Sequence, residues 1–479
     1  MSKRLSQTSM MLGVRESQCL PGAELISRSE MATLLRVFDL MKVLFLLLLT
    51  TASALAIQIA PFRADVTPPI GAPLCGGLVK PAVGVSEPLL ALGVVLLSDE
   101  KPVVLCAVDF CEIRGADHIH WREVLAKAAG TSVKRVALHS LHQHNAPLVD
   151  NAAQKLLPEI GILDAAATEK ALAGIAASIE AALKAPQPVT HISTGEAKVL
   201  EVAGNRRVQV IDGKVGKMRG SGSKDPVLRA LPEGLIDPFL KSVSFWNGDK
   251  KLAALHYYAT HPMSYYGDGI ISHDFAGIAR EKRTKEEGVP HIYFTGCGGN
   301  IGAGKYNDGT PPMRPLLAGR IHAAMVESEQ NAKRVPLTKL AWKHVPVVLQ
   351  PDPEFPEERM LKVMQNTATA PTTRIAAALR IGFIRHREPI PFTSLHLGDD
   401  VCLVHLPGES FVEYQLFAQQ KRAGGFVCTA SYSDGVTGYI PLEHSFIEGG
   451  YEPTQAYAAP ESEKVMKETI AKLLRPASQ

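Results

Sequence analysis

The sequence lacks an excess of charge of either sign. Lys and Arg together number 51 and Asp and Glu together number 48, which gives a net charge of +3 over 479 residues. No block rich in lysine and arginine occurs along the chain. Proteins that bind nucleic acids depend on basic patches that neutralise phosphates. The composition therefore gives no support for a nucleic-acid partner.

Paired cysteine motifs are missing as well. No Cys-x-x-Cys spacing occurs, which disfavours a metal ion held by cysteines. Export would permit disulfides, but several cysteines lie inside apolar runs and are expected to be buried as small hydrophobic side chains. Six cysteines follow residue 56: Cys75, Cys106, Cys111, Cys297, Cys402 and Cys428.

The hydrophobic run near the N-terminus is too short to cross a membrane, since a spanning helix needs about 20 apolar residues. Residues 41–56, MKVLFLLLLTTASALA, combine one lysine, a short apolar core and a small-x-small ending. This layout is typical of a secretory signal peptide. We therefore expect 1–40 to be an overextension of the gene model, with Met31 or Met41 as the true start. The exported chain, 57–479, is then secreted or periplasmic without a transmembrane span. An uncleaved N-terminal anchor is the alternative.

The chain does contain alternating apolar strands and helices. Near-continuous apolar segments indicate strands covered on both faces, and helical patterns lie between them. We expect an α/β protein, a layered α/β/α sandwich with a central mixed sheet in a single large domain, without an internal sequence repeat. Gly195–Pro238 and Pro351–Pro391 are predicted to be long excursions. The predicted strands are 102–110, 133–140, 252–260, 291–296, 400–408 and 425–433, and the predicted helices are 165–185, 316–329, 411–422 and 461–474.

The segment HQHNAP carries two histidines, His142 and His144, directly after a predicted strand. On extended backbone their side chains point to the same side. Two imidazoles at a strand-to-loop junction are a common beginning of a metal site. The segment alone equally allows one surface histidine and one histidine satisfied by a backbone carbonyl.

Unusual polar residues also follow the other predicted strands. Asp109 ends the first strand, and His261 follows the third in THPMSYYG. A glycine-rich loop follows the fourth, Glu409 follows the fifth and Tyr439 follows the sixth. Ligand sites in α/β sheets gather at the carboxyl ends of strands. His261, Glu409 and Tyr439 are therefore expected to converge with His142.

Two histidines and a carboxylate are a familiar donor set for Zn²⁺, with one position left for water. A tyrosinate is a less usual fourth ligand. Each residue also has an ordinary structural explanation. Glu409 suits the first turn of a helix, Tyr439 suits packing, and His261 suits a capped loop. The residues by themselves leave both interpretations open.

The ordered series of motifs from 61 to 474 resembles the neutral/alkaline ceramidase family. In chain order the motifs are DVTPPIG, HQHNAP, NRR, THP, TGCGGNIG, LPGE and GYIP followed by GGYE. The resemblance implies that one zinc ion is bound by four residues: His142, His261, Glu409 and Tyr439.

The resemblance also implies roles for residues around the substrate. His144 would act as general acid/base and Tyr451 would donate a hydrogen bond to the developing oxyanion. Arg206 would anchor a polar or anionic group of the substrate. Zinc in such a site lowers the pKa of bound water towards about 7 and polarises an amide carbonyl.

Two departures from the family pattern concern the substrate and the domain content. The family carries an aspartate and a serine in its glycine-rich loop, where this chain has Asn300 and Gly302 in NIGA. These two positions are still expected to face the substrate. The loop continues with Lys305, Asn307 and Asp308, which indicates a more polar substrate. The chain also leaves no room for the family's C-terminal immunoglobulin-like domain.

The sequence therefore predicts an exported, zinc-dependent hydrolase that cleaves an amide or ester bond of a small-molecule or lipid-like substrate through a metal-activated water. The alternative is a catalytically silent protein that uses the same pocket to bind a lipid or sugar derivative. Intact His144 and Tyr451 favour the enzyme, whereas loss of the serine at position 302 favours the binder. A purely structural surface protein is disfavoured by the polar strand ends.

Overall fold

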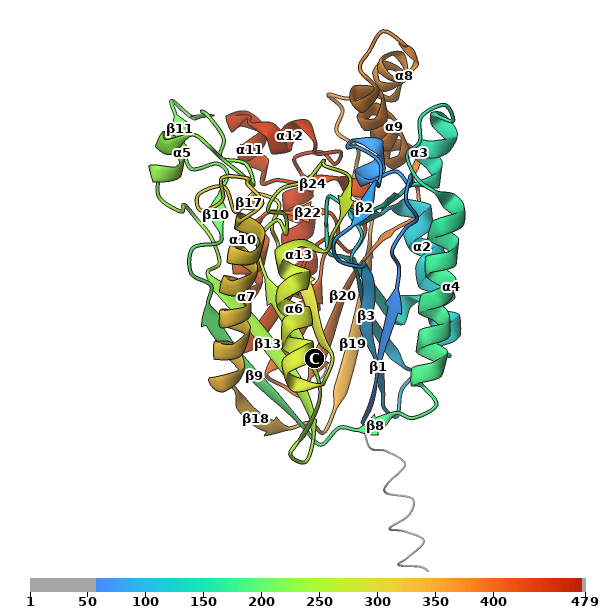
Figure 1. Cartoon of the computed structure of the whole chain (residues 1–479), viewed down its shortest axis with the longest axis vertical. Helices are drawn as coiled ribbons and strands as arrows, with labels where there is room; N and C mark the ends of the chain where they lie inside the picture. Colours follow the sequence, from blue (N-terminus) through green and yellow to red (C-terminus); the bar gives the residue numbers. More distant parts are fainter. Residues whose placement is uncertain (1–56, 476–479) are drawn as a thin grey trace, which may run out of the picture. The chain divides into compact units, whose positions relative to one another are not determined.

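The computed structural model describes residues 57–475 (Figure 1). These residues form three main β-sheets, in which four strands share one topology. In each sheet three successive strands pair antiparallel, and a fourth strand returns through a helix to lie parallel to the third. A further helix follows the fourth strand. The predicted signal peptide at 41–56 and the predicted overextension at 1–40 lie outside the described residues.

The three sheets follow one another along the chain. The first sheet contains β1 (Gln58–Asp65), β3 (Leu90–Leu97), β4 (Val103–Val108), β6 (Val136–Ser140) and the edge strand β8 (Gln187–Pro188), and its helices are α2 (Gly115–Ala128) and α4 (Ala165–Ala182). The second sheet contains β9 (His191–Lys198), β13 (Phe239–Asn247), β14 (Lys250–Tyr258), β16 (His291–Thr295) and the edge strand β18 (Lys333–Pro336), and its helices are α6 (Asp274–Glu287) and α7 (Met313–Gln330). The third sheet contains β19 (Leu340–Val347), β20 (Ile390–Leu397), β21 (Val401–His405) and β23 (Phe426–Ala430), and its helices are α10 (Val412–Lys421) and α13 (Ser462–Leu474).

The six strands predicted from the sequence are the parallel pairs β4–β6, β14–β16 and β21–β23. They are recognisable because both of their faces are buried. In β4, Val104 and Cys106 pack beneath helices, whereas Leu105 and Ala107 belong to a core that the three sheets share. The four predicted helices correspond to α4, α7, α10 and α13.

A single apolar core joins the inner faces of all three sheets, with Leu92, Val243 and Leu403 as members from each. Helices cover the outer faces: α2 and α4 the first sheet, α6 and α7 the second, α10 and α13 the third (Figure 1). The predicted α/β class with helix-covered mixed sheets is confirmed. The strands divide among three sheets rather than one, because one open sheet of so many twisted strands would curl or split.

Helices α2 and α6 are not evident in the sequence, and the reason is the polar residues that they bury. In α6 the buried positions include Asp274, Arg280 and Arg283, which interrupts the apolar period that marks a helix. Arg280 donates two hydrogen bonds of 2.6 Å to Asp109, the polar residue noted after the first predicted strand. The excursion at 351–391 likewise contains two helices, α8 (Glu357–Gln365) and α9 (Pro371–Arg385).

The first four residues of the other predicted excursion, 195–238, belong to β9. The remainder, the 199–238 segment between β9 and β13, holds short elements: β10 (Gly204–Asn205), β11 (Val210–Ile211), β12 (Lys214–Val215) and α5 (Pro226–Ala230). Strand β10 pairs antiparallel with β17 (Ile301–Gly302) of the glycine-rich loop. The six cysteines within residues 57–475 are buried and unpaired. Across the same residues, no helix is both long and apolar enough to span a membrane.

Candidate metal centre

The loops after the third and fourth strands of the three sheets meet at one end of the fold. His142 follows β6 of the first sheet, and His261 follows β14 of the second. Glu409 lies in β22 (Glu409–Ser410), after β21 of the third sheet, and Tyr439 begins β24 (Tyr439–Ile440), after β23. The three sheets therefore each deliver a polar side chain to the same place.

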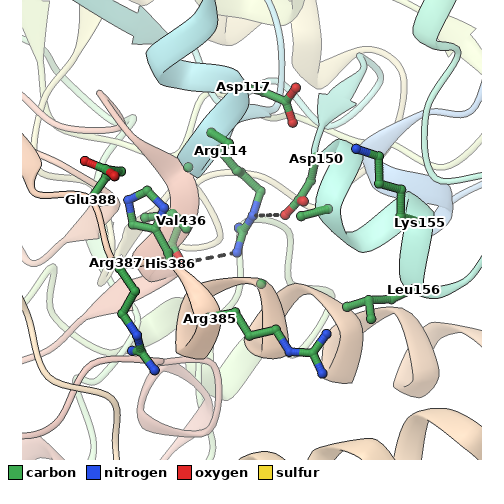
Figure 2. Close-up of a pocket in the computed structure, with 14 residues that line it drawn as sticks. Arg114, Asp117, Asp150, Lys155, Leu156, Arg385, His386, Arg387, Glu388 and Val436 are labelled. Atoms are coloured by element: carbon green, nitrogen blue, oxygen red, sulfur yellow. Dashed lines mark hydrogen bonds and ion pairs between the residues drawn. The ribbon is translucent and has the colours of Figure 1, made fainter.

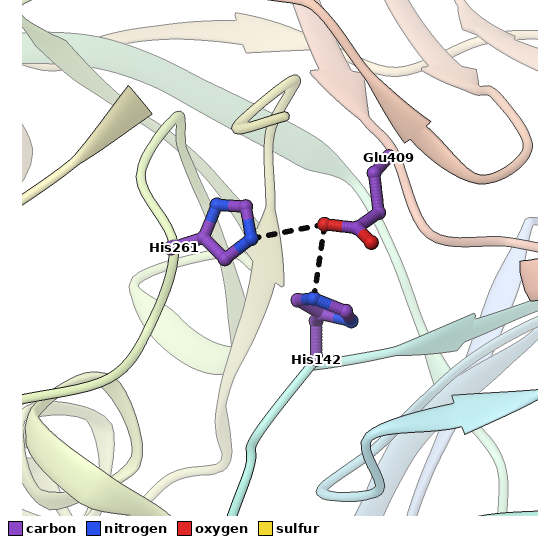
Figure 3. Close-up of side chains that lie close together, drawn as sticks. All are labelled: His142, His261 and Glu409. Carbon is purple, nitrogen blue, oxygen red and sulfur yellow. Dashed lines mark hydrogen bonds and ion pairs between the residues drawn. The ribbon is translucent and has the colours of Figure 1, made fainter. Parts of the chain in front are cut away.

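His142, His261 and Glu409 form a buried cluster (Figure 3). The Oε2 atom of Glu409 lies 2.9 Å from Nε2 of His261 and 3.1 Å from Nε2 of His142. The hydroxyl of Tyr439 lies 3.3 Å from Nε2 of His261. The structure thus brings together the four side chains that the resemblance assigns to zinc.

The hydrogen bonds of the two histidines are compatible with a metal ion between their Nε2 atoms and Glu409. Nδ1 of His142 lies 3.1 Å from the carbonyl oxygen of Cys111, and Nδ1 of His261 lies 2.6 Å from that of Gly298. A carbonyl oxygen only accepts, so each Nδ1 carries a proton, and in the neutral form of each ring the lone pair is on Nε2. Both Nε2 lone pairs then face the carboxylate of Glu409, and His142 Nε2 is buried without a hydrogen-bond partner. This donor set fits Zn²⁺, whose histidine ligands usually donate their other nitrogen to a carbonyl or carboxylate.

The electrostatics of the cluster keep Glu409 ionised. Burial alone would raise the pKa of Glu409, but His142 and His261 lower it well below its usual range. Burial lowers the pKa of His261 to about 4, and Arg206 adds to this effect. Burial also raises the pKa of Tyr439 well above its usual value, against the opposing charge of Arg206. An ionised carboxylate and a neutral imidazole are the forms that bind metal.

The backbone at His142 is held in a left-handed conformation, with φ of 67°. Such a conformation costs free energy in a non-glycine residue and is concentrated at functional sites. Tyr432 takes the same place after β23 that His142 takes after β6, and its φ is 59°. The two rings stack with centroids 4.4 Å apart. Tyr432 therefore supports the ring plane of His142.

A second group of possible ligands, His256, His291 and Glu329, has its charges matched by protein side chains. Lys251 pairs with Glu329 at 2.8 Å, and Arg283 pairs with it as well. Nε2 of His256 is hydrogen-bonded to Nδ1 of His291 at 2.8 Å. These contacts account for the charges and lone pairs without a metal ion.

A cavity of about 500 Å³ opens beside the cluster of His142, His261 and Glu409, which we call the metal cluster. The residues that line it include His144, Arg206, Tyr439 and Tyr451. Nδ1 of His144 donates to the carbonyl oxygen of His142 at 3.2 Å, which leaves its Nε2 lone pair available. Tyr451, about half exposed, begins α12 (Tyr451–Thr454), and its ring centroid lies 5.7 Å from that of Tyr439. The two predicted catalytic residues thus share a cavity with the predicted ligand Tyr439.

The three predicted substrate-binding residues lie in different surroundings. Arg206 is buried and donates to the hydroxyl of Tyr439 at 2.9 Å. The side chain of Asn300 accepts from the backbone N–H of Val412 and donates to Glu413, each at 2.9 Å. Gly302, in β17, pairs with Gly204, in β10. Of the three, Arg206 alone lines the cavity.

Sequence reasoning missed several residues around the site. Ser221 and Tyr266 line the cavity. Ser221 lies outside the motifs considered above, and Tyr266 lies in THPMSYYG, where His261 alone was considered. Glu112 lies four residues after β4, as Glu409 lies four residues after β21. Its Oε1 atom is 3.8 Å from Nδ1 of His142. The repeated topology of the sheets is the signal that could have identified Glu112.

Another hollow, of about 530 Å³, lies around Arg114 (Figure 2). Arg114 pairs with Glu112, lies 3.1 Å from Asp150 and donates to the carbonyl oxygen of Val436 at 3.3 Å. The lining of this hollow contains none of the clustered ligands. The cavity lined by His144 is therefore the candidate site, whereas Arg114 holds Glu112 beside His142.

Comparison with solved structures places this geometry in a known fold. The chain is similar to a ceramidase complexed with C2, with a TM-score of 0.68 and 16% identity over 88% of this chain and 75% of that one. It is also similar to the neutral ceramidase from Pseudomonas aeruginosa, with a TM-score of 0.66 and 16% identity over 88% of this chain and 74% of that one. The fold is that of the neutral ceramidases. The sequence matches no protein-family model and no curated protein.

The neutral ceramidase fold confirms the resemblance noted in the sequence motifs at the level of architecture. It also explains why motifs spread from 61 to 474 matter together, because the fold brings their loops to one end. A fold does not determine function, so a metal and a reaction can be inferred only from the side chains of this chain itself.

Proposed function

We propose that this chain is an exported, zinc-dependent hydrolase that cleaves an amide or ester bond. The observation that carries the proposal is the arrangement of His142, His261 and Glu409, in which the Nε2 atoms of two histidines face one carboxylate oxygen and both Nδ1 atoms face carbonyl oxygens. A divalent cation satisfies all three groups at once. Tyr439 stands within reach as a fourth ligand, since its hydroxyl lies 3.3 Å from His261 Nε2.

The residues around the cavity suit the steps of acyl transfer. When bound, zinc lowers the pKa of water and polarises the carbonyl of the scissile bond. His144 accepts the proton of the attacking water at its free Nε2 atom and passes it to the leaving nitrogen or oxygen. Burial lowers the pKa of His144 well below its usual value, which keeps this nitrogen unprotonated and able to accept. Tyr451 donates a hydrogen bond to the oxygen on which negative charge develops.

A protein that binds a ligand without hydrolysing it is the second candidate, and one observation favours it. Position 302 is glycine where the resembled family motif has a serine, so one hydroxyl of the glycine-rich loop is missing. Such a protein would retain the cavity and the metal to bind a lipid or sugar derivative. The presence of both His144 and Tyr451 in the cavity favours the hydrolase, because binding alone requires neither acid/base group.

The proposal is tested by metal analysis and hydrolysis together. We expect the purified chain to hold one zinc ion, and we expect a chelator to abolish hydrolysis of short amides and esters until zinc is restored. The variant His142→Ala should lose zinc, whereas His256→Ala, in the group whose charges are already matched, should retain it. A protein that takes up no zinc contradicts the metal site. A zinc-loaded protein that hydrolyses no amide or ester supports the binder instead.

Export is proposed from residues 41–56 and is tested at the N-terminus of the exported protein. The small-x-small ending at 54–56 predicts that the mature chain begins at or near Ile57. N-terminal sequencing of protein recovered from the periplasm or medium checks this. Recovery of an exported protein that still carries residues 1–40 would show that the predicted start and cleavage site are wrong.

A further inference from the structure

The lining of the cavity beside the metal cluster is polar and aromatic. Apart from glycines, the side chains that lack a polar hydrogen-bonding group are those of Met218 and Met263. A site for a long alkyl chain needs continuous aliphatic walls. A ligand rich in hydroxyl groups suits this cavity better, because each buried hydroxyl requires a partner. The polar and aromatic lining residues include His144, Arg206, Ser221, Tyr266, Tyr439 and Tyr451.

Ser221 supplies a hydroxyl at the place where Gly302 lacks one. A Cβ atom built on Gly302 would lie 3.2 Å from the Oγ atom of Ser221. This Oγ atom accepts a hydrogen bond from Nη2 of Arg206 at 3.2 Å, and Nη1 of Arg206 donates to Tyr439. The hydroxyl therefore comes from the 199–238 segment instead of the glycine-rich loop. Because it accepts from Arg206, its own proton is available to donate to a ligand.

Two exposed aromatic rings stand on the same cavity. Tyr266 and Tyr451 are 49% and 52% exposed. The ring centroids of Tyr266 and His144 are 4.9 Å apart, so the ring of Tyr266 is close to the proposed acid/base group. Aromatic faces next to hydrogen-bonding groups suit a ligand that has both apolar C–H faces and hydroxyls, such as a saturated sugar ring.

We propose that the cavity binds a small acylated polyol or sugar, and that Ser221 and Arg206 together hold a hydroxyl next to the acyl group. This proposal rests on the proposed hydrolase function. Water adds to the acyl carbonyl, the bond from that carbon to the nitrogen or oxygen of the sugar breaks, and the proton of the water passes through His144 to the leaving atom. The products are a short carboxylic acid and the free amine or hydroxyl of the sugar.

The substrate class is tested on the zinc-loaded mature protein. We expect kcat/KM for N-acetylated and O-acetylated methyl glycosides to exceed that for N-acetylsphingosine by at least about 10-fold, since the cavity offers partners for hydroxyls rather than for an alkyl chain. A preference for N-acetylsphingosine or for a long-chain ceramide would overturn the proposal and leave the hydrolase function in place.

Ser221→Ala tests the residue that sets this preference. We expect kcat/KM for the acetylated glycoside to fall by about 10- to 100-fold, and to fall little for the matching deoxy glycoside that lacks the neighbouring hydroxyl. Ser223→Ala is the matched control, because its hydroxyl accepts from the backbone N–H of Asp225 and lies outside the lining of the cavity. An equal loss on both glycosides would assign Ser221 a purely structural role and contradict the proposal.

Binding separates failure of this proposal from failure of the proposed function. If the zinc-loaded protein hydrolyses none of the probes, the hydrolase function is wrong, and titration calorimetry with the same glycosides then tests the cavity. Glycoside binding that weakens about 10-fold in Ser221→Ala supports the ligand class. Absence of glycoside binding in the wild-type protein overturns it.

Discussion

At the scale of single residues, His142 and His144 differ in what their side chains can reach. Both use Nδ1 to donate to a carbonyl oxygen, that of Cys111 for His142 and that of His142 itself for His144. Nε2 of His142 lies 3.1 Å from Glu409, whereas His144 lines the cavity. Two histidines of one short motif therefore suit the different tasks proposed for them, His142 as a metal ligand and His144 as the acid/base group.

This difference predicts different consequences for two alanine variants. His144→Ala should keep its zinc and lower kcat/KM by about 10²- to 10⁴-fold, because an acid/base group is lost and no ligand is removed. His142→Ala should lose zinc and activity together. Zinc content per chain, measured beside kcat/KM, checks both. Loss of zinc from His144→Ala would mean that both histidines are ligands.

Gly408 places Glu409, and its replacement tests that placement. Its φ is 55°, and a Cβ atom there would lie 2.1 Å from Oγ1 of Thr437 and 2.5 Å from the carbonyl oxygen of Gly438. We expect Gly408→Ala to lower the free energy of unfolding by about 2–4 kcal/mol, through strain and displacement of the turn, and to weaken zinc binding.

The control for this variant is Gly398→Ala. Gly398 has a φ of 65° but no atom within 4 Å of the added Cβ. It should therefore show the cost of the backbone conformation alone, about 1 kcal/mol, with unchanged zinc affinity. Urea unfolding and zinc titration of the two variants are the measurements. Equal zinc affinity in both would show that Gly408 has no special role in placing Glu409.

At the scale of elements, the 199–238 segment is held by hydrogen bonds from the glycine-rich loop. Nζ of Lys305 donates to the carbonyl oxygens of Arg229 and Leu231. The amide of Asn307 donates to the carbonyl oxygens of Ser221 at 2.7 Å and Ser264 at 2.6 Å. These polar loop residues hold a wall of the cavity in place, whereas the sequence suggested that they face the substrate.

Removal of one of these contacts should loosen this wall. We expect Lys305→Met to raise KM by about 3- to 10-fold, because the ordered conformation of this cavity wall is less populated in the variant. Zinc content should stay unchanged. Limited proteolysis should cut the 199–238 segment faster than in the wild type. Lys224→Met, on an exposed lysine of the same segment, is the matched control. A KM unchanged in Lys305→Met would show that the segment is held without this contact.

At the scale of the whole molecule, buried histidines in the three sheets make stability depend on pH. His139 in β6, His256 in β14 and His405 in β21 are fully buried, and burial lowers the pKa of each to about 3. In the unfolded chain a histidine has a pKa near 6.5. Between these two values the unfolded chain binds protons that the folded chain does not, so acid favours unfolding.

We expect the free energy of unfolding to be greatest above pH 6.5 and to fall as the pH decreases from 6.5 towards 3, by up to about 1.4 kcal/mol per pH unit for each of these histidines. His405→Leu tests this, because both ring nitrogens of His405 lack hydrogen-bond partners. The variant should be at least as stable at pH 7.5 and should show a shallower decline. Urea unfolding of the zinc-free proteins at several pH values is the measurement, and an identical slope would contradict the prediction.

The strands of the parallel pairs and the helices with an apolar stripe were predictable from the sequence. A strand such as β4, with all six residues buried, must be apolar throughout. Helix α6 escaped prediction because its buried face includes Arg280, whose charge is matched by Asp109 far away in the sequence. The identical topology of the three sheets left no visible sequence repeat, because burial requires apolar residues and not particular ones.

For the site, the sequence by itself determined which residue types end each strand: a histidine after β6 and β14, a glutamate after β21, a tyrosine after β23. Only the tertiary structure decided that these four side chains meet. It also decided that Nδ1 of His142 and of His261 is hydrogen-bonded to a carbonyl oxygen, and that Ser221 lies beside Gly302. The physical reason is that a strand end is a local property of the chain. The distance between two strand ends depends on how three separate sheets pack around one core.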